Sequence, residues 1–149
     1  MCGIVAVTGY KKALPLLING LEKLEYRGYD SAGIAIINSE TNIISCNKAE
    51  GKLKNLISNL NDHNIHNIPG TVGIGHTRWA THGKPEVKNA HPHTDSSGNI
   101  AVVQNGIIEN FQDLKNKLQK EGIIFNSDTD TEVIPHLIER ELNLSLIHI

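Results

Sequence analysis

Short apolar runs, most of them bounded by glycine, alternate in this chain with stretches whose apolar residues recur at helical spacing. This alternation limits the fold more than any other feature of the sequence, because strands and helices need different periods. The apolar runs predict strands over residues 4–7, 33–37, 72–76 and 100–104. Since few polar residues interrupt them, we expect these strands to be buried. The pattern predicts a mixed α/β or α+β domain.

Four stretches have apolar residues at the spacing of an amphipathic helix, namely residues 13–24, 53–60, 111–118 and 129–138. Gly122 is suited to end the third helix, because glycine readily adopts the left-handed conformation found there. Thr129 and Glu132 have the spacing of a capping box, which predicts that the last helix opens at Thr129. The polar segment 63–70 ends in Pro-Gly and is predicted to be a loop.

Charge and cysteine content exclude several classes of protein. Fourteen basic and sixteen acidic residues give a formal net charge of −2, and no run of Lys or Arg suggests a nucleic-acid partner. The apolar runs are too short to span a membrane, and the start of the chain lacks the pattern of a signal peptide. Cys2 and Cys46 do not form a disulfide or zinc pattern, so we expect a reducing, cytoplasmic setting. Cys46 is predicted to be a small buried hydrophobic residue.

Cys2 is a candidate nucleophile because it becomes the N-terminal residue when Met1 is removed. Removal of methionine is favoured before a small residue. The exposed cysteine then carries a thiol, with a pKa of about 8.5, beside a free α-amine with a pKa of about 7.7–8.0. The amine can accept the thiol proton, directly or through water, so one residue supplies both nucleophile and base. Taken alone, a cysteine at this position is a weak signal.

Three further segments contain more functional groups than folding alone requires. Residues 26–33 (YRGYDSAG) combine aromatic, charged and small residues, and residues 76–83 (HTRWATHG) follow a predicted strand. The planar guanidinium of Arg78 is suited to bind a carboxylate through two parallel hydrogen bonds. The Asn105 amide and the Gly106 backbone N–H could together stabilise an oxyanion, although Asn-Gly is also the sequence of an ordinary tight turn.

These segments together resemble one family. The motifs MCGI, YRGYDSAG, HTRWATHG, NAHPH, QNGIIEN and TDTE are similar, in this order, to those of the class II glutamine amidotransferases, which are N-terminal-nucleophile hydrolases. The resemblance extends from residue 1 to about residue 142. The forms YRGYDS and WATH favour the glucosamine-6-phosphate synthase branch over amidophosphoribosyltransferase. The family fold implied is α+β, a four-layer α-β-β-α sandwich, here incomplete.

The resemblance implies roles for five residues of a glutaminase site. Cys2 would attack the side-chain amide of glutamine, form a γ-glutamyl thioester and release ammonia. Asn105 and the N–H of Gly106 would form the oxyanion hole. Arg78 would bind the α-carboxylate of glutamine and Asp130 its α-ammonium group. No cofactor and no metal are implied.

The resemblance also assigns residues around this centre. Trp79, Thr81 and His82 belong to a loop that closes on glutamine, and Arg27 helps to position the nucleophile end of the site. His91 is placed with the substrate-binding residues as a hydrogen-bonded histidine. In the complete protein the ammonia would be delivered to fructose 6-phosphate, and the full-length chain would be a homo-oligomer.

Other interpretations stay open for several of these residues. Trp79 could be an ordinary core residue, and the sequence His91-Pro92-His93 could suggest a metal site. No cysteine or carboxylate completes a recognisable ligand set with the two histidines. We assign no role to His63, His66 or His136, which are expected on the surface or in helices.

The expected domain boundaries follow from the resemblance. Residues 1–143 form a partial glutaminase domain, residues 144–149 depart from the family as a non-native or unassigned tail, and the downstream sugar isomerase domains are absent. We expect missing strands to leave sheet edges unpaired and the isolated chain to be poorly soluble or partly unfolded. The alternatives are a non-catalytic or unstable fragment that at most binds glutamine, and the front half of another class II amidotransferase, such as amidophosphoribosyltransferase.

Overall fold

The computed structural model describes residues 2–62, 65, 68–79 and 84–147. Short 3₁₀ turns (η) occur between the regular helices and strands. In chain order the elements are β1 (Gly3–Val7), α1 (Ala13–Leu24), η1 (Glu25–Arg27), β2 (Ser31–Ile37), β3 (Ile44–Glu50), α2 (Leu53–Asp62), β4 (Gly73–Arg78), η2 (Val87–Asn89), β5 (His93–Thr94), β6 (Ala101–Val102), α3 (Phe111–Lys120) and α4 (Val133–Ile147).

The strands form two antiparallel sheets. The larger sheet has four strands in the order β1-β4-β2-β3, and β5 pairs with β6 in a second, two-stranded sheet. Within the larger sheet, Gly3 pairs with Thr77 and Gly33 pairs with His76. Because β4 lies between β1 and β2, the start of the chain is adjacent to the strand that ends at Arg78.

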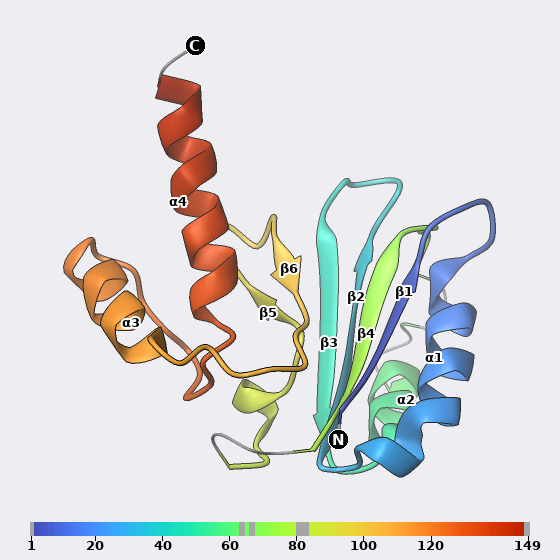
Figure 1. Cartoon of the computed structure of the whole chain (residues 1–149). Coiled ribbons are helices and arrows are strands. Elements are labelled where there is room, and N and C mark those ends of the chain that lie inside the picture. The colour runs from blue at the N-terminus through green and yellow to red at the C-terminus, as the bar shows by residue number, and fades with distance from the viewer. Residues whose placement is uncertain (1, 63–64, 66–67, 80–83, 148–149) are drawn as a thin grey trace.

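The elements are stacked in four layers, as Figure 1 shows. Helices α1 and α2 cover one face of the four-stranded sheet, and the β5–β6 sheet lies on its other side. Helix α4 contacts β5 and β6, and α3 packs against α4. The predicted α-β-β-α sandwich is therefore confirmed. In the part of the chain that the structure describes, its second sheet has two strands.

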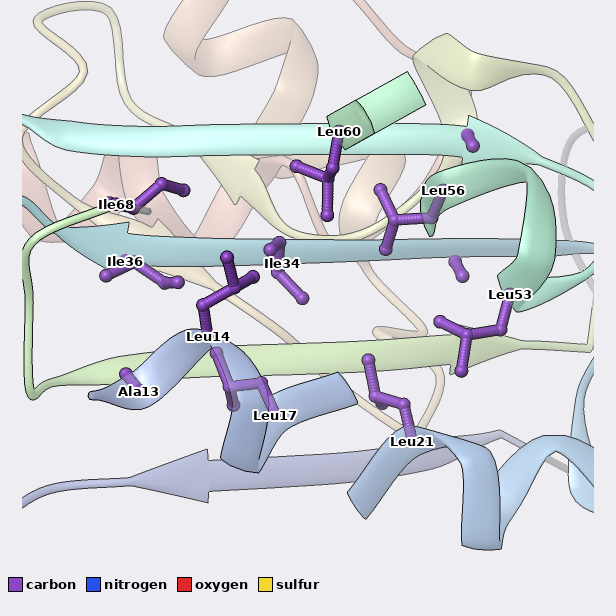
Figure 2. Close-up of a cluster of buried hydrophobic side chains, with 12 residues drawn as sticks. Ala13, Leu14, Leu17, Leu21, Ile34, Ile36, Leu53, Leu56, Leu60 and Ile68 are labelled. Atoms are coloured by element: carbon purple, nitrogen blue, oxygen red, sulfur yellow. The ribbon is translucent and has the colours of Figure 1, made fainter. Parts of the chain in front are cut away.

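The hydrophobic core lies between the four-stranded sheet and helices α1 and α2 (Figure 2). Leu17 and Leu21 of α1 are fully buried, as are Ile34 and Ile36 of β2 and Leu56 of α2. Each such side chain contributes about 1.5–3 kcal/mol to folding when it leaves water. This core fixes the sheet, so its opposite face can carry polar side chains.

Two glycines allow close approaches on that opposite face. A Cβ at Gly33 would collide with the carbonyl oxygen of His91, so only glycine lets the segment before β5 lie directly on the sheet. A Cβ at Gly28 would lie 2.8 Å from the carbonyl carbon of Arg78. Gly28 therefore allows the turn after η1 to pack against the end of β4.

Three local predictions were wrong. Helix α4 begins at Val133, not at a capping box, because Glu132 accepts hydrogen bonds from Asn126 and Ser127, while the Thr129 hydroxyl contacts His93. The strand expected over residues 100–104 is shortened to Ala101–Val102. The predicted strands also left out β3, of seven residues, and β5, of two residues.

Other local predictions were confirmed. Helix α3 ends at Lys120, and Gly122 follows with a φ of 92°. The backbone N–H of Gly122 donates to the carbonyl of Gln119 at 3.0 Å, as expected for a helix C-terminus. Cys46 lies in β3 and is half-buried, so the prediction of a buried residue is confirmed only in part. Within the described ranges, none of the helices is long and apolar enough to cross a lipid bilayer.

Candidate active site

A cavity of about 490 Å³ opens where the two sheets meet the start of the chain. It brings together residues that are far apart in the sequence. Its lining consists of Cys2, Arg27, His76, Arg78, Trp79, His91, Gln104, Asn105, Gly106, Ile107, Thr129, Asp130 and Thr131. The lining includes eight residues that the sequence singled out: Cys2, Arg27, Arg78, Trp79, His91, Asn105, Gly106 and Asp130.

The thiol of Cys2 lies at the mouth of this cavity, against the end of β4. The backbone N–H of Trp79 donates to Cys2 Sγ at 3.2 Å. The Gly3–Thr77 pair fixes this contact, because it sets Cys2 beside the residues that follow Thr77. Cys2 is half-buried. Sγ also lies 3.5 Å from the carbonyl oxygen of Trp79, so both polar groups of the Trp79 backbone hold the Cys2 side chain in place.

Strand β4 supplies two polar side chains to the cavity. His76 and Arg78 are two residues apart, so they project from the same face of the strand. Both are buried, at 1% and 4% exposure. Burial lowers the pKa of Arg78, and the charges of Cys2, Asp30 and Asp130 oppose that effect. The guanidinium stays protonated at physiological pH, so it provides a positive charge at the cavity wall.

Asn105 and Gly106 lie in the turn after β6. The side chain of Asn105 donates from Nδ2 to the carbonyl oxygen of Cys2 at 3.1 Å. Its Oδ1 atom lies 2.8 Å from Nε2 of His76. This side-chain amide thus connects the turn to the first residue of the expected mature chain and to the middle of the sheet.

Asp130 lies in the segment before α4 and is 5% exposed. Its Oδ2 atom accepts the backbone N–H of Ile108 at 2.7 Å. Thr131, the next residue, donates its hydroxyl to Oε1 of Gln104 at 3.0 Å. These bonds hold the acidic segment against the Asn-Gly turn, so a carboxylate lies in the same cavity as the Arg78 guanidinium.

Three histidines form a stack, and two of them, His76 and His91, line the cavity. The rings of His76 and His91 are 4.3 Å apart and nearly parallel, and His93 meets His91 edge-on at 4.7 Å. Burial lowers the pKa of His76 to about 4 and that of His93 to about 3, and it also lowers the pKa of His91. All three rings are therefore neutral at physiological pH.

Each imidazole in the stack is hydrogen-bonded to protein. Nδ1 of His91 accepts the backbone N–H of Gln104 at 3.4 Å, and Nε2 of His93 lies 2.9 Å from the hydroxyl of Thr129. Among the described residues, no group of three or more His, Cys, Asp and Glu is arranged to hold a metal ion. The stack instead connects β4 and β5 to the segments that line the cavity.

The remaining predicted residues have different surroundings. Trp79 is 42% exposed and packs edge-on against Tyr29 at 5.2 Å, so the alternative that it is a core residue is wrong. Thr81 and His82 lie outside the described residues, as do His63 and His66. His136 lies in helix α4, which was one of its two expected locations, and its side chain is buried. It is 2% exposed and packs edge-on against Phe125.

Sequence reasoning missed several lining residues, of which His76 is the most informative. The alternation of side chains along a strand could have identified it, because His76 shares a face with Arg78. Gln104, Thr129 and Thr131 belong to the motifs QNGIIEN and TDTE, but the sequence assigned none of them to the cavity. These residues reach the cavity through the stacking of two sheets, which a local pattern does not encode.

Comparisons with known proteins agree with this arrangement. A family model described as a glutamine amidotransferase domain matches residues 42–143. The glutamine–fructose-6-phosphate aminotransferase [isomerizing] of Gloeobacter violaceus is 59% identical over 138 residues, which cover 93% of this chain and 22% of that protein. The protein of the same name from Pyrococcus horikoshii is 55% identical over 145 residues, covering 97% of this chain and 23% of the relative.

Solved structures give the same fold at lower identity. The glutamine phosphoribosylpyrophosphate amidotransferase of B. subtilis superposes with a TM-score of 0.75 at 30% identity, covering 92% of this chain and 29% of that one. A structure described as the allosteric regulatory enzyme of purine biosynthesis gives 0.76 at 31% identity, with the same coverage. The chain spans about a fifth of the length of the curated relatives it matches. It belongs to the glutamine amidotransferase domain family, in the class II form that uses an N-terminal nucleophile.

Proposed function

We propose that this chain catalyses the hydrolysis of glutamine to glutamate and ammonia, with Cys2 as the nucleophile. After removal of Met1, the α-amine of Cys2 accepts the thiol proton, and sulfur attacks the side-chain carbonyl carbon of glutamine. The tetrahedral intermediate collapses, the amine returns the proton to the leaving nitrogen, and ammonia departs. Water then attacks the γ-glutamyl thioester, which releases glutamate and restores the thiol.

One observation carries this proposal. Nδ2 of Asn105 donates to the carbonyl of Cys2, so a hydrogen-bond donor is attached to the residue that would attack the substrate. The second N–H of this nitrogen and the backbone N–H of Gly106 are the donors that we assign to the oxyanion. The loss of one such donor typically lowers the rate about 10²- to 10³-fold.

Charge pairing accounts for the choice of glutamine. The substrate has a carboxylate and an ammonium group on its α-carbon, and the cavity contains Arg78 and Asp130, one partner of each sign. We assign the carboxylate to Arg78 and the ammonium group to Asp130. Trp79, Thr81 and His82 are assigned to the segment that covers the substrate, and Arg27 and His91 to the support of the pocket.

We propose further that the ammonia serves amino-sugar synthesis in a longer protein. The relatives that are 55–59% identical are named for glutamine and fructose 6-phosphate, whereas the phosphoribosylpyrophosphate amidotransferase of B. subtilis is 30% identical. Fructose 6-phosphate is therefore the acceptor that we favour. A homo-oligomer in the cytoplasm is the setting that we propose for the complete protein.

The test is the intact mass of the purified chain before and after treatment with 6-diazo-5-oxo-norleucine, a glutamine analogue with an electrophilic ketone. We expect loss of Met1 and one covalent adduct, mapped to Cys2 by peptide analysis. Excess glutamine should suppress the adduct, and the untreated chain should release ammonia from glutamine.

The chain provides a matched control, because its other cysteine is Cys46. Cys46→Ser should still form the adduct, whereas Cys2→Ser should form none. A chain that has lost Met1 but forms no glutamine-protected adduct would support the alternative of a non-catalytic fragment. Retention of Met1 would contradict the nucleophile assignment, since the α-amine of Cys2 would not exist.

A further inference from the structure

We propose that His76 is a positioning residue that fixes the side-chain amide of Asn105 in the orientation needed for an oxyanion hole. This inference rests on the proposed glutaminase function for its catalytic meaning. His76 lies in the middle of the sheet, and Asn105 lies in an exposed turn.

The orientation of the amide follows from its two partners. The carbonyl oxygen of Cys2 can only accept a hydrogen bond, so the atom of Asn105 that faces it at 3.1 Å must be the nitrogen. The oxygen of the amide then faces Nε2 of His76 at 2.8 Å. Because an amide oxygen can only accept, Nε2 must carry the proton.

The His76 ring is held firmly enough to impose this orientation. It is 1% exposed, stacks on His91 at 4.3 Å, and belongs to a strand paired on both sides, opposite Ile4 and Gly33. Burial lowers the pKa of His76 to about 4, so the ring is neutral at physiological pH. A neutral ring has one N–H, and the contact with Asn105 uses it.

The consequence for catalysis follows from counting donors. Nδ2 of Asn105 has two N–H groups, of which one is directed to Cys2, so the other is left for a ligand in the cavity. Without His76, the amide could turn over and present its oxygen to the developing oxyanion. The repulsion between two oxygens would then remove the stabilisation that the amide provides.

Labelling kinetics with 6-diazo-5-oxo-norleucine test this role, because the maximal rate and the half-saturating concentration are measured separately. His76→Leu, which removes the donor, should lower the maximal rate about 10- to 100-fold and change the half-saturating concentration less than about 2-fold. His76→Gln places an N–H near the same point and should restore most of the loss. In an Asn105→Ala background, His76→Leu should cause no further loss.

An additive loss in the double variant, or equal loss in the Leu and Gln variants, would overturn the proposal in favour of a purely structural role.

The protonation state of the His76 ring can be measured without enzymatic activity and without a variant. In the ¹⁵N-labelled chain, the nitrogen shifts of His76 should identify the Nε2–H form, with Nε2 in the range of a protonated and Nδ1 in the range of an unprotonated imidazole nitrogen. A His76 ring protonated on Nδ1 would overturn the proposal even if labelling succeeds. Failure of the wild-type chain to label, with the Nε2–H form observed, would reject the glutaminase function and keep the positioning contact.

Discussion

The carboxylate of Glu132 accepts both the backbone N–H and the hydroxyl of Ser127, at 2.7 and 2.5 Å. It also accepts the backbone N–H of Asn126 at 2.7 Å. Glu132 is 3% exposed, so these bonds form away from water. The segment between Ser127 and Glu132 contains Asp130, and the bonds at its two ends therefore fix the position of the acidic side chain in the cavity.

We predict that Glu132→Gln lowers the free energy of unfolding by about 1–3 kcal/mol, because an amide N–H₂ would face buried donors that need an acceptor. Urea unfolding measures the change. Glu86→Gln is the matched control, since Glu86 forms an exposed ion pair with Lys88 and should cost less than about 1 kcal/mol. Equal effects in the two variants would contradict the role of Glu132.

Stability should fall as the pH is lowered from about 6.5 to 3. The pKa of His76 is about 4 and that of His93 about 3 in the folded chain, below the usual 6.5, so the unfolded state binds more protons in this range. Stability therefore rises with pH and is fully present above 6.5. Each pKa unit of difference corresponds to about 1.4 kcal/mol. Thermal unfolding at pH 7.5, 5.5 and 4.5 measures the trend, and a flat profile would contradict it.

Glu132 adds to the loss at lower pH. Burial alone would raise its pKa, but the nearby His136 ring and the hydrogen bonds from Asn126 and Ser127 lower it to about 2. The stability that it contributes is present above pH 4.5 and is lost as the pH falls towards 2. Glu132→Gln should remove this part of the pH dependence and leave the part between pH 6.5 and 4.5 unchanged.

Gly33→Ala should disturb the cavity as well as the stability. The new Cβ would collide with the carbonyl of His91, which must move off the sheet at a cost of about 1–3 kcal/mol. Movement of this segment should also slow labelling of Cys2 by the glutamine analogue. Gly122→Ala is the control, because Gly122 has a φ of 92° but open space around it, so it should cost about 1 kcal/mol without affecting labelling.

Cys46 should react with iodoacetamide more slowly than Cys2. Burial raises the pKa of the Cys46 thiol, with Lys48 opposing that effect, and its Sγ lies 3.9 Å from the carbonyl of Pro92. At pH 7.5 we expect the first alkylated peptide to contain Cys2. Peptide mapping over time measures the order, and equal rates would contradict the burial of Cys46.

Much of the first half of the fold could be predicted from sequence, because its elements follow local rules. Helix α1 and strand β1 match the predicted ranges closely, since their apolar residues face one core. The start of α4 could not be predicted in this way. Thr129 and Glu132 have capping-box spacing, but their side chains find partners in His93, Asn126 and Ser127, and these tertiary contacts outweigh the local motif.

The residues of the site also divide into those that a local sequence pattern can identify and those that depend on tertiary contacts. Cys2, Arg78 and Asn105 could be identified because their residue types suit nucleophilic attack, carboxylate binding and oxyanion stabilisation. The connection between Asn105 and His76 spans 29 residues and depends on how the turn after β6 meets the sheet. A motif gives the chemistry of a residue, whereas the partner that orients its side chain is set by the tertiary structure.

The pairing of β1 with β4 also has a consequence for the order of events during synthesis. Gly73, the first residue of β4, follows Gly3 by 70 positions, so the ribosome adds the partner strand roughly 4–14 s after β1 at about 5–20 residues per second. During this interval the beginning of the chain has no strand to pair with and is open to an aminopeptidase. We therefore expect Met1 to be removed in the interval before the end of β4 packs beside Cys2.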